Sequence, residues 1–195
     1  MARKDFKIIS EWVKQDSRIL DLGCGDGTLL KILKQERNSS GYGVDTSIDK
    51  IIKSFDNNIN VINADINNRL DYFSDNSFDY VILAQSLQVV NDPVDLIKEM
   101  LRIGNEVIIS FPNMGYWKSR FYLFLKGQMP VTKELPYSWH STPNIHLCTI
   151  KDFKQMCRTN NFTIVDEVIS SGKDSSVSTG YLSNLLGESA IFKVK

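Results

Sequence analysis

Short apolar runs alternate with stretches of helical periodicity along the first half of this chain. The runs have the length expected of strands buried on both faces of a parallel sheet, and they lie at residues 18–22, 41–45, 60–65, 78–83 and 107–109. The stretches between them carry apolar residues three or four positions apart, which predicts amphipathic helices, at residues 4–15, 29–33, 48–55 and 93–101. This alternation predicts a doubly wound parallel sheet with right-handed crossovers.

The second half of the chain departs from this alternation. Residues 114–147 are rich in aromatic residues and prolines, which predicts a helix near 116–125 followed by an ordered loop. We interpret this segment as the cover of a site at the edge of the sheet. Further strands are predicted at 162–169 and 190–194, and the serine-rich stretch 170–176 between them is predicted to be a mobile loop tip.

Two helix starts are marked by capping residues. Asp92 followed by Pro93 combines an acceptor at the N-cap with a proline in the first turn, where no N–H is needed. Thr149 and Asp152 have the spacing of a capping box. Both patterns predict that a helix begins at the residue after the cap.

The stretch from Ile19 to Gly27 breaks from an apolar run into glycines spaced G-x-G-x-G, and a helical pattern follows at once. Glycines in such a turn permit positive φ and let a ligand approach the backbone closely, which indicates a nucleotide-like cofactor. A dinucleotide site has the spacing G-x-G-x-x-G, so an NAD-dependent dehydrogenase is disfavoured. Asp21 would repel a phosphate but suits an ammonium or sulfonium, and S-adenosylmethionine carries both.

The next two apolar runs also end in acids. Asp45 stands where a second strand would hold a ribose by its two hydroxyls. Asp65 ends the third run, where it could accept a hydrogen bond from an adenine amino group. The alternative is that Asp45 is a helix N-cap or turn residue and that Asp65 shapes a loop. Three acids that end three successive strands favour a cofactor site.

These motifs resemble a known superfamily and, within it, one family. Class I S-adenosylmethionine-dependent methyltransferases are similar in the motifs at residues 20–27, 43–45, 64–65 and 78–83. The MetW family of methionine biosynthesis is similar in the motifs at residues 110–113, 127–132, 142–149 and 184–188. The resemblance implies one Rossmann-like domain over residues 1–195, with a doubly wound, mostly parallel seven-stranded sheet whose last strand is antiparallel. In that domain residues 114–147 are the cover segment.

The methyltransferase resemblance also implies which residues bind S-adenosylmethionine or its product S-adenosylhomocysteine. Asp21 would hold the methionine portion with the backbone of the glycine turn, Asp45 would bind the ribose and Asp65 the adenine. Cys24 matches the motif only through its backbone. The full set of implied cofactor-binding residues is Asp21, Gly23, Cys24, Gly25, Asp45, Thr46, Ala64, Asp65 and Gln85.

The sequence gives less information about the residues that would carry out methyl transfer. Methyl transfer needs a nucleophile in line with the methyl group, and a general base only when that nucleophile arrives protonated. Candidates for a base or a substrate contact are His146, His140, Tyr137 and Gln85. His146 also suits a structural, hydrogen-bonded role, and His140 a partner interface. The superfamily has no universal catalytic residue, so the catalytic residue is left unassigned.

The resemblance to MetW implies a role beside a homoserine O-acyltransferase, whose activity members of the family support. The protein would then be an accessory or a regulator that senses S-adenosylmethionine. The alternative is a methyltransferase that acts on a small-molecule acceptor. Whether the protein is an enzyme stays open at this point.

Composition narrows the remaining possibilities. Basic and acidic residues balance at 23 each, which disfavours nucleic acid as a partner. The three cysteines lack C-x-x-C spacing, which argues against a disulfide framework or a metal site and favours the cytoplasm. No apolar stretch approaches the roughly 20 residues that span a bilayer, so no membrane association is expected. The sequence leaves the oligomeric state open.

Overall fold

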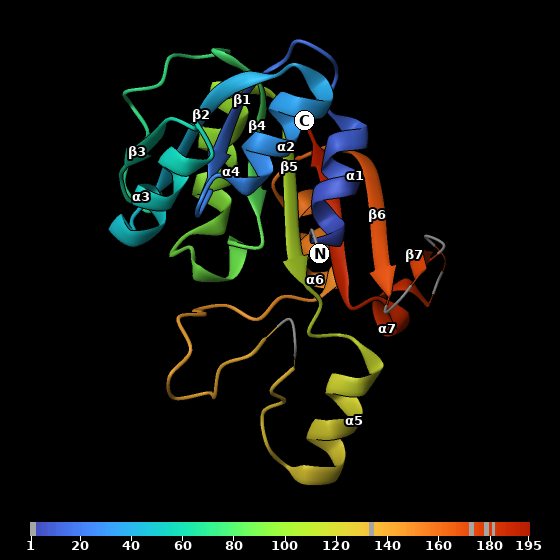
Figure 1. Ribbon diagram of the computed structural model, residues 1–195. Helices are drawn as coiled ribbons and strands as arrows, with labels where there is room; N and C mark the ends of the chain where they lie inside the picture. Colours follow the sequence, from blue (N-terminus) through green and yellow to red (C-terminus); the bar gives the residue numbers. More distant parts are fainter. Residues whose placement is uncertain (1–2, 133–134, 172–173, 178–179, 181) are drawn as a thin grey trace.

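The structure is a computed structural model that describes residues 3–132, 135–171, 174–177, 180 and 182–195 (Figure 1). Its strands are β1 (Arg18–Leu22), β2 (Ser40–Asp45), β3 (Val61–Asn63), β4 (Phe78–Ala84), β5 (Gly104–Pro112), β6 (Ile164–Ser171), β7 (Asp174–Val177) and β8 (Ser189–Val194). Its helices are α1 (Lys4–Trp12), α2 (Thr28–Arg37), α3 (Ile48–Asp56), the 3-10 turn η1 (Leu87–Val89), α4 (Pro93–Ile103), α5 (Trp117–Lys126), α6 (Ile150–Thr159) and α7 (Ser183–Leu186).

The strands form one sheet in the order β3-β2-β1-β4-β5-β8-β6-β7. Strands β1 to β5 pair in parallel, whereas the last strand, β8, lies antiparallel between β5 and β6. The predicted α/β class, a doubly wound and mostly parallel sheet with an antiparallel last strand, is therefore confirmed. The reversal of strand order between β1 and β4 marks the edge where such folds bind ligands.

Within the described residues the sheet has eight strands, one more than the seven predicted. The prediction of a loop tip over 170–176 was wrong at both ends, because Ser170 and Ser171 belong to β6 and residues 174–176 to β7. Residues 172–173 lie outside the described part of the chain. Strand β7 pairs antiparallel with β6 at the edge of the sheet, where one face need not be buried and a polar sequence can form a strand.

Helices cover both faces of the sheet, and successive strand residues point alternately into the two layers (Figure 1). Leu20 and Leu22 of β1 belong to the core under α4 and α6, whereas Ile19 belongs to the core under α1 and α2. At the centre of the first layer the rings of Phe153 and Phe192 lie 4.6 Å apart. This two-sided burial explains why the strands appear in the sequence as continuous apolar runs.

Both predicted helix starts are confirmed by hydrogen bonds. The carboxylate of Asp92 accepts from the backbone N–H of Asp95 at 3.0 Å, and Pro93 opens α4. The hydroxyl of Thr149 accepts from the N–H of Asp152 at 3.2 Å, while the Asp152 carboxylate accepts from the N–H of Thr149 at 3.1 Å. The second pair is a complete capping box at the start of α6.

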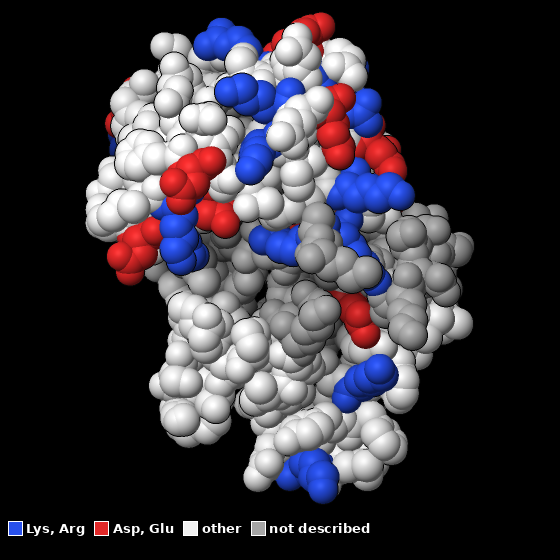
Figure 2. Space-filling model, viewed as in Figure 1, with Lys and Arg blue, Asp and Glu red and all other residues white. Residues whose placement is uncertain are grey.

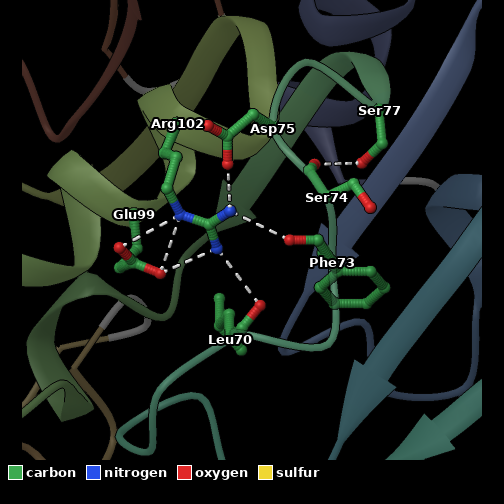
Figure 3. A network of polar contacts seen from close by, with 7 residues as sticks. All are labelled: Leu70, Phe73, Ser74, Asp75, Ser77, Glu99 and Arg102. Carbon is green, nitrogen blue, oxygen red and sulfur yellow. Dashed lines mark hydrogen bonds and ion pairs between the residues drawn. The ribbon is translucent and has the colours of Figure 1, made fainter.

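The irregular connection between β3 and β4 is fixed by Arg102 of α4, whose guanidinium points into it (Figure 3). One terminal nitrogen donates to the carbonyl of Phe73 at 2.9 Å and to Asp75 at 2.6 Å. The other donates to the carbonyl of Leu70 at 3.3 Å and to Glu99 at 3.0 Å. Hydrogen bonds to Glu99 and then Asp75 raise the pKa of Arg102 above its usual value. The hydrogen bonds of Arg102 thus hold residues 70–75 in place, a segment that forms neither helix nor strand.

Residues 114–147, which we call the arm, leave the sheet after β5 and return before α6 (Figure 1). Helix α5 stands apart from the two helical layers in Figure 1, and Ser119 is its only buried residue. The arm rejoins the body where the backbone N–H groups of Ile145 and His146 donate to the carbonyl of Gln88 at 2.8 and 3.0 Å. Within the described residues, no helix is both long and apolar enough to cross a membrane.

Candidate functional site

Three acids lie along one edge of the sheet. Strands β3, β2 and β1 are neighbours that run in parallel, so their carboxyl ends meet at the same edge. Asp21 of β1 pairs in register with Gly43, and Asp45 ends β2 opposite Asn63. Asp65 follows the end of β3 by two residues. The sequence prediction that these side chains share one edge therefore agrees with the topology.

The glycine turn after β1 adopts the left-handed backbone that its composition predicts. Gly23 and Gly25 have φ values of +70° and +60°, which residues other than glycine rarely adopt. A Cβ at Gly23 would lie 2.7 Å from the hydroxyl of Ser86, so the turn packs tightly against the loop after β4. The N–H of Gly23 donates to the carbonyl of Val44 at 2.7 Å. The turn therefore lets a ligand come close to the backbone, whereas the N–H of Gly23 is already used in a hydrogen bond within the protein.

Asp45 joins the glycine turn to the start of α3. Its carboxylate accepts from the N–H of Gly25 at 2.8 Å and, through the other oxygen, from the N–H of Ser47 at 2.8 Å. The side chain is 8% exposed. Asp45 is therefore a turn-forming residue, as the alternative interpretation expected. Because each carboxylate oxygen can accept more than one hydrogen bond, Asp45 can still accept hydrogen bonds from two hydroxyl groups of a ligand. Beside it, the backbone carbonyl of Thr46 accepts from Asn63 at 3.3 Å, a contact that sequence reasoning missed.

Asp21 is the most unusual group at this edge. It is 2% exposed, and its Oδ1 has no hydrogen-bond partner among the described residues. Burial raises the pKa of Asp21 to about 8, with further upward contributions from Asp45 and Asp5 and a downward one from Arg3. A buried carboxyl oxygen without a partner is costly to the fold, and groups with such perturbed pKa values are concentrated at functional sites. A ligand cation with N–H donors would supply the hydrogen bond that Oδ1 of Asp21 lacks.

Asp65 is exposed and takes part in a local turn. One carboxylate oxygen accepts from the N–H of Asn67 at 2.9 Å and from its side-chain amide at 3.0 Å. The N–H of Ala64 donates to the carbonyl of Asp45 at 3.3 Å, which ties this loop to the end of β2. Asp65 therefore shapes its loop, as the alternative interpretation expected. The contact of Asp65 with adenine stays a prediction.

Gln85 connects the site to the N-terminal helix by a route that sequence reasoning missed. Its φ is +59°, and its N–H donates to the carbonyl of Ser110 at 2.9 Å. The hydroxyl of Ser110 in turn donates to Asp5 at 3.0 Å, and Asp5 forms an ion pair with Arg3 at 2.6 Å. The available signal was a serine within the apolar run of β5. It gave no indication of a partner 105 residues away.

The candidate bases occupy different places. His146 is exposed at the base of the arm, where its Nε2 lies 3.2 Å from the carbonyl oxygen of Asn91. His140 and Tyr137 are exposed farther along the arm, and the His140 ring lies 5.7 Å from that of Trp139. Of the four candidates that include Gln85, only His146 lines the cavity described next. The catalytic assignment stays open.

A cavity of about 190 Å³ lies between η1, the end of β5, the base of the arm and α6. Its wall is mostly apolar, with Leu87, Phe153 and Met156 among its members. Gln88 lines the cavity, and its buried side-chain oxygen has no hydrogen-bond partner among the described residues. None of the predicted cofactor-binding residues lines this cavity, whose wall suits a small, mainly apolar molecule.

Comparison with known proteins gives consistent matches. The family model described as "Methionine biosynthesis protein MetW" matches residues 3–194. A bifunctional methionine biosynthesis protein MetXA/MetW from Rhodopirellula baltica is 36% identical over 173 residues, which cover 84% of this chain but only 28% of that protein. A demethylmenaquinone methyltransferase from Listeria welshimeri is 26% identical over 191 residues, covering 87% of this chain and 80% of the relative.

The fold has close counterparts among solved structures. An S-adenosylmethionine-dependent methyltransferase from Mesorhizobium loti superposes with a TM-score of 0.72, covering 99% of this chain and 98% of its own. The two sequences are only 14% identical, so this likeness is one of fold. It establishes the class I methyltransferase fold that the strand order indicates.

Proposed function

This chain belongs to the MetW family of methionine biosynthesis proteins, and from that premise we propose that it binds S-adenosylmethionine and supports a homoserine O-acyltransferase. The observation that carries the partnership is the bifunctional relative, in which a MetW portion and a MetXA portion share one chain. The family match also runs through the arm, where a methyltransferase would encode its acceptor specificity.

The carboxylate edge fits this cofactor. The unpaired, buried oxygen of Asp21 supports an assignment to the ammonium group of the methionine portion. The remaining acceptor capacity of Asp45 suits the two ribose hydroxyls, and the glycine turn allows close approach without a Cβ. Bound S-adenosylmethionine would supply an electrophilic methyl group. In an accessory protein the same residues need only bind and orient the molecule, so that its presence is sensed.

The partnership is tested with a purified homoserine O-acyltransferase from the same organism. We expect the two proteins to co-elute in size-exclusion chromatography, and the acyltransferase rate to rise when this protein is added. Bovine serum albumin at the same concentration is the control for nonspecific stabilisation. If neither co-elution nor a change in rate occurs, with or without S-adenosylmethionine, the proposal is wrong.

Asp45→Ala is expected to weaken the binding of S-adenosylhomocysteine by about 1 to 3 kcal/mol, because the ribose hydroxyls lose their buried acceptor. Isothermal titration calorimetry measures the dissociation constant. Asp56→Ala, an exposed carboxylate at the end of α3, is the matched control and should bind as the wild type does. An unchanged dissociation constant for Asp45→Ala would place the ribose elsewhere.

A second candidate function is methyl transfer to a small acceptor. It is favoured by the apolar cavity at η1 and by the likeness to demethylmenaquinone methyltransferases. Incubation with S-adenosylmethionine that carries a radiolabelled methyl group, together with a panel of quinols and other small acceptors, distinguishes it. Transfer of label to an acceptor would make the protein an enzyme, and lack of transfer across the panel would count against this function.

A further inference from the structure

The arm exposes an unusual amount of apolar surface. Twelve of the twenty large apolar side chains that are exposed in the described residues lie in this segment. Phe124 is 83% exposed and Trp139 is 77% exposed. Together the twelve side chains expose on the order of 1,000 Å² of surface along the arm. This area matches the roughly 800 Å² that each partner contributes to a standard protein interface.

Helix α5 lacks the packing that usually stabilises a helix of its length. It has ten residues, and only Ser119 is buried. Short helices owe most of their stability to an apolar face that is packed against another element. In α5 the exposed apolar residues include Phe121 and Leu125 on one side and Leu123 on another, so they surround the helix. A partner that encloses α5 in a groove would cover them, whereas a lipid surface selects helices with one apolar and one polar face.

The charge of the arm also limits its partners. In the sequence the arm carries four basic residues and one acidic residue, namely Lys118, Arg120, Lys126, Lys133 and Glu134, so its net charge is positive. On the face shown in Figure 2 the far end of the arm is white and blue. Symmetric pairing with a second copy would bring like charges to the same interface, which is unfavourable. An apolar groove with an acidic rim would be complementary.

We propose that the arm is the surface through which this protein docks on the acyltransferase, with α5 seated in an apolar groove that has an acidic rim. This inference rests on the proposed function and assigns the partnership to particular residues. The relative with MetW and MetXA portions in one chain favours this occupant over a membrane or a second copy.

Phe124→Asp tests the assignment in the full chain. Calorimetric titration with the purified acyltransferase should show affinity at least about 30-fold weaker, as expected when an aromatic anchor is lost from an interface centre. Phe55→Asp, which alters a comparably exposed phenylalanine of α3, is the matched control and should stay within about 3-fold. Affinity for S-adenosylhomocysteine and the circular dichroism spectrum should be unchanged in both variants. Leu125→Asp should repeat the loss.

The outcomes separate the two proposals. If the wild type binds the acyltransferase and both arm variants bind equally well, docking through the arm is wrong while the proposed function stands. If the wild type does not bind it, the proposed function itself fails. Self-association or attachment to anionic phospholipid vesicles that is abolished by Phe124→Asp, without an effect on acyltransferase binding, would give the arm a different occupant and overturn the inference.

Discussion

Asp21→Asn is expected to stabilise the protein at pH 8 by about 2 to 5 kcal/mol and, at the same pH, to weaken its binding of S-adenosylhomocysteine at least tenfold. The stabilisation follows from burial, which raises the pKa of this carboxyl from 3.8 to about 8. Between these values the unfolded chain has released the proton while the folded chain retains it. Each pH unit in this window therefore lowers the stability of the wild type, by up to about 1.4 kcal/mol.

The pH profile distinguishes this cause from others. At pH 3 the folded protein and most of the unfolded chains of the wild type hold the proton, so the variant and the wild type should be about equally stable. The gain should grow up to about pH 8 and then level off. Urea unfolding at a series of pH values measures it, with the exposed carboxylate variant Asp71→Asn as the control. A gain that does not depend on pH, or a variant that binds the ligand as tightly as the wild type, would contradict the role given to Asp21.

Asn113→Ala is expected to destabilise the protein by about 3 to 4 kcal/mol, because it leaves several buried backbone groups without partners. Asn113 is 3% exposed. Its amide donates to the carbonyls of Asn184 at 3.0 Å and Gly187 at 2.7 Å. Its side-chain oxygen accepts from the N–H groups of Gly115 at 2.9 Å and Ile150 at 3.3 Å. The side chain of Asn113, which follows β5, thus connects the first residues of the arm, the start of α6 and the region of α7.

Urea unfolding at pH 7 tests this prediction, and Asn68→Ala, an exposed asparagine in a loop, is the control. Asn113→Asp keeps the two acceptor contacts but replaces the donor to the carbonyls of Asn184 and Gly187 with a carboxylate oxygen. It should therefore also be clearly less stable than the wild type. A loss below about 1 kcal/mol for Asn113→Ala would mean that solvent replaces these hydrogen bonds.

Asn113 also shows where sequence reasoning reaches its limit. The motifs at residues 110–113 and 184–188 were recognised only as marks of the family, and their physical role emerges when the fold brings them together across 71 and 74 residues of sequence. No local pattern predicts such a pairing. The contact between Ser110 and Asp5, which supports Gln85, was missed for the same reason.

Features that depend on local periodicity were predicted well. Two-sided burial leaves continuous apolar runs, so β1 and β4 were found nearly to the residue. The acids at the strand ends were located because parallel topology places them on one edge. Strand β7 was missed because pairing at a sheet edge, rather than burial, determines it. The exposure of α5 could not be predicted either, since its apolar residues suggest a helix that is packed.

The most direct test of the cofactor assignment is a crystal structure of the protein with S-adenosylhomocysteine. We predict that the ligand lies along the carboxyl ends of β1 and β2, with its ribose hydroxyls on Asp45 and its ammonium group within hydrogen-bond distance of Asp21. A ligand bound away from this edge, or one whose ammonium and ribose contact neither carboxylate, would contradict the assignment.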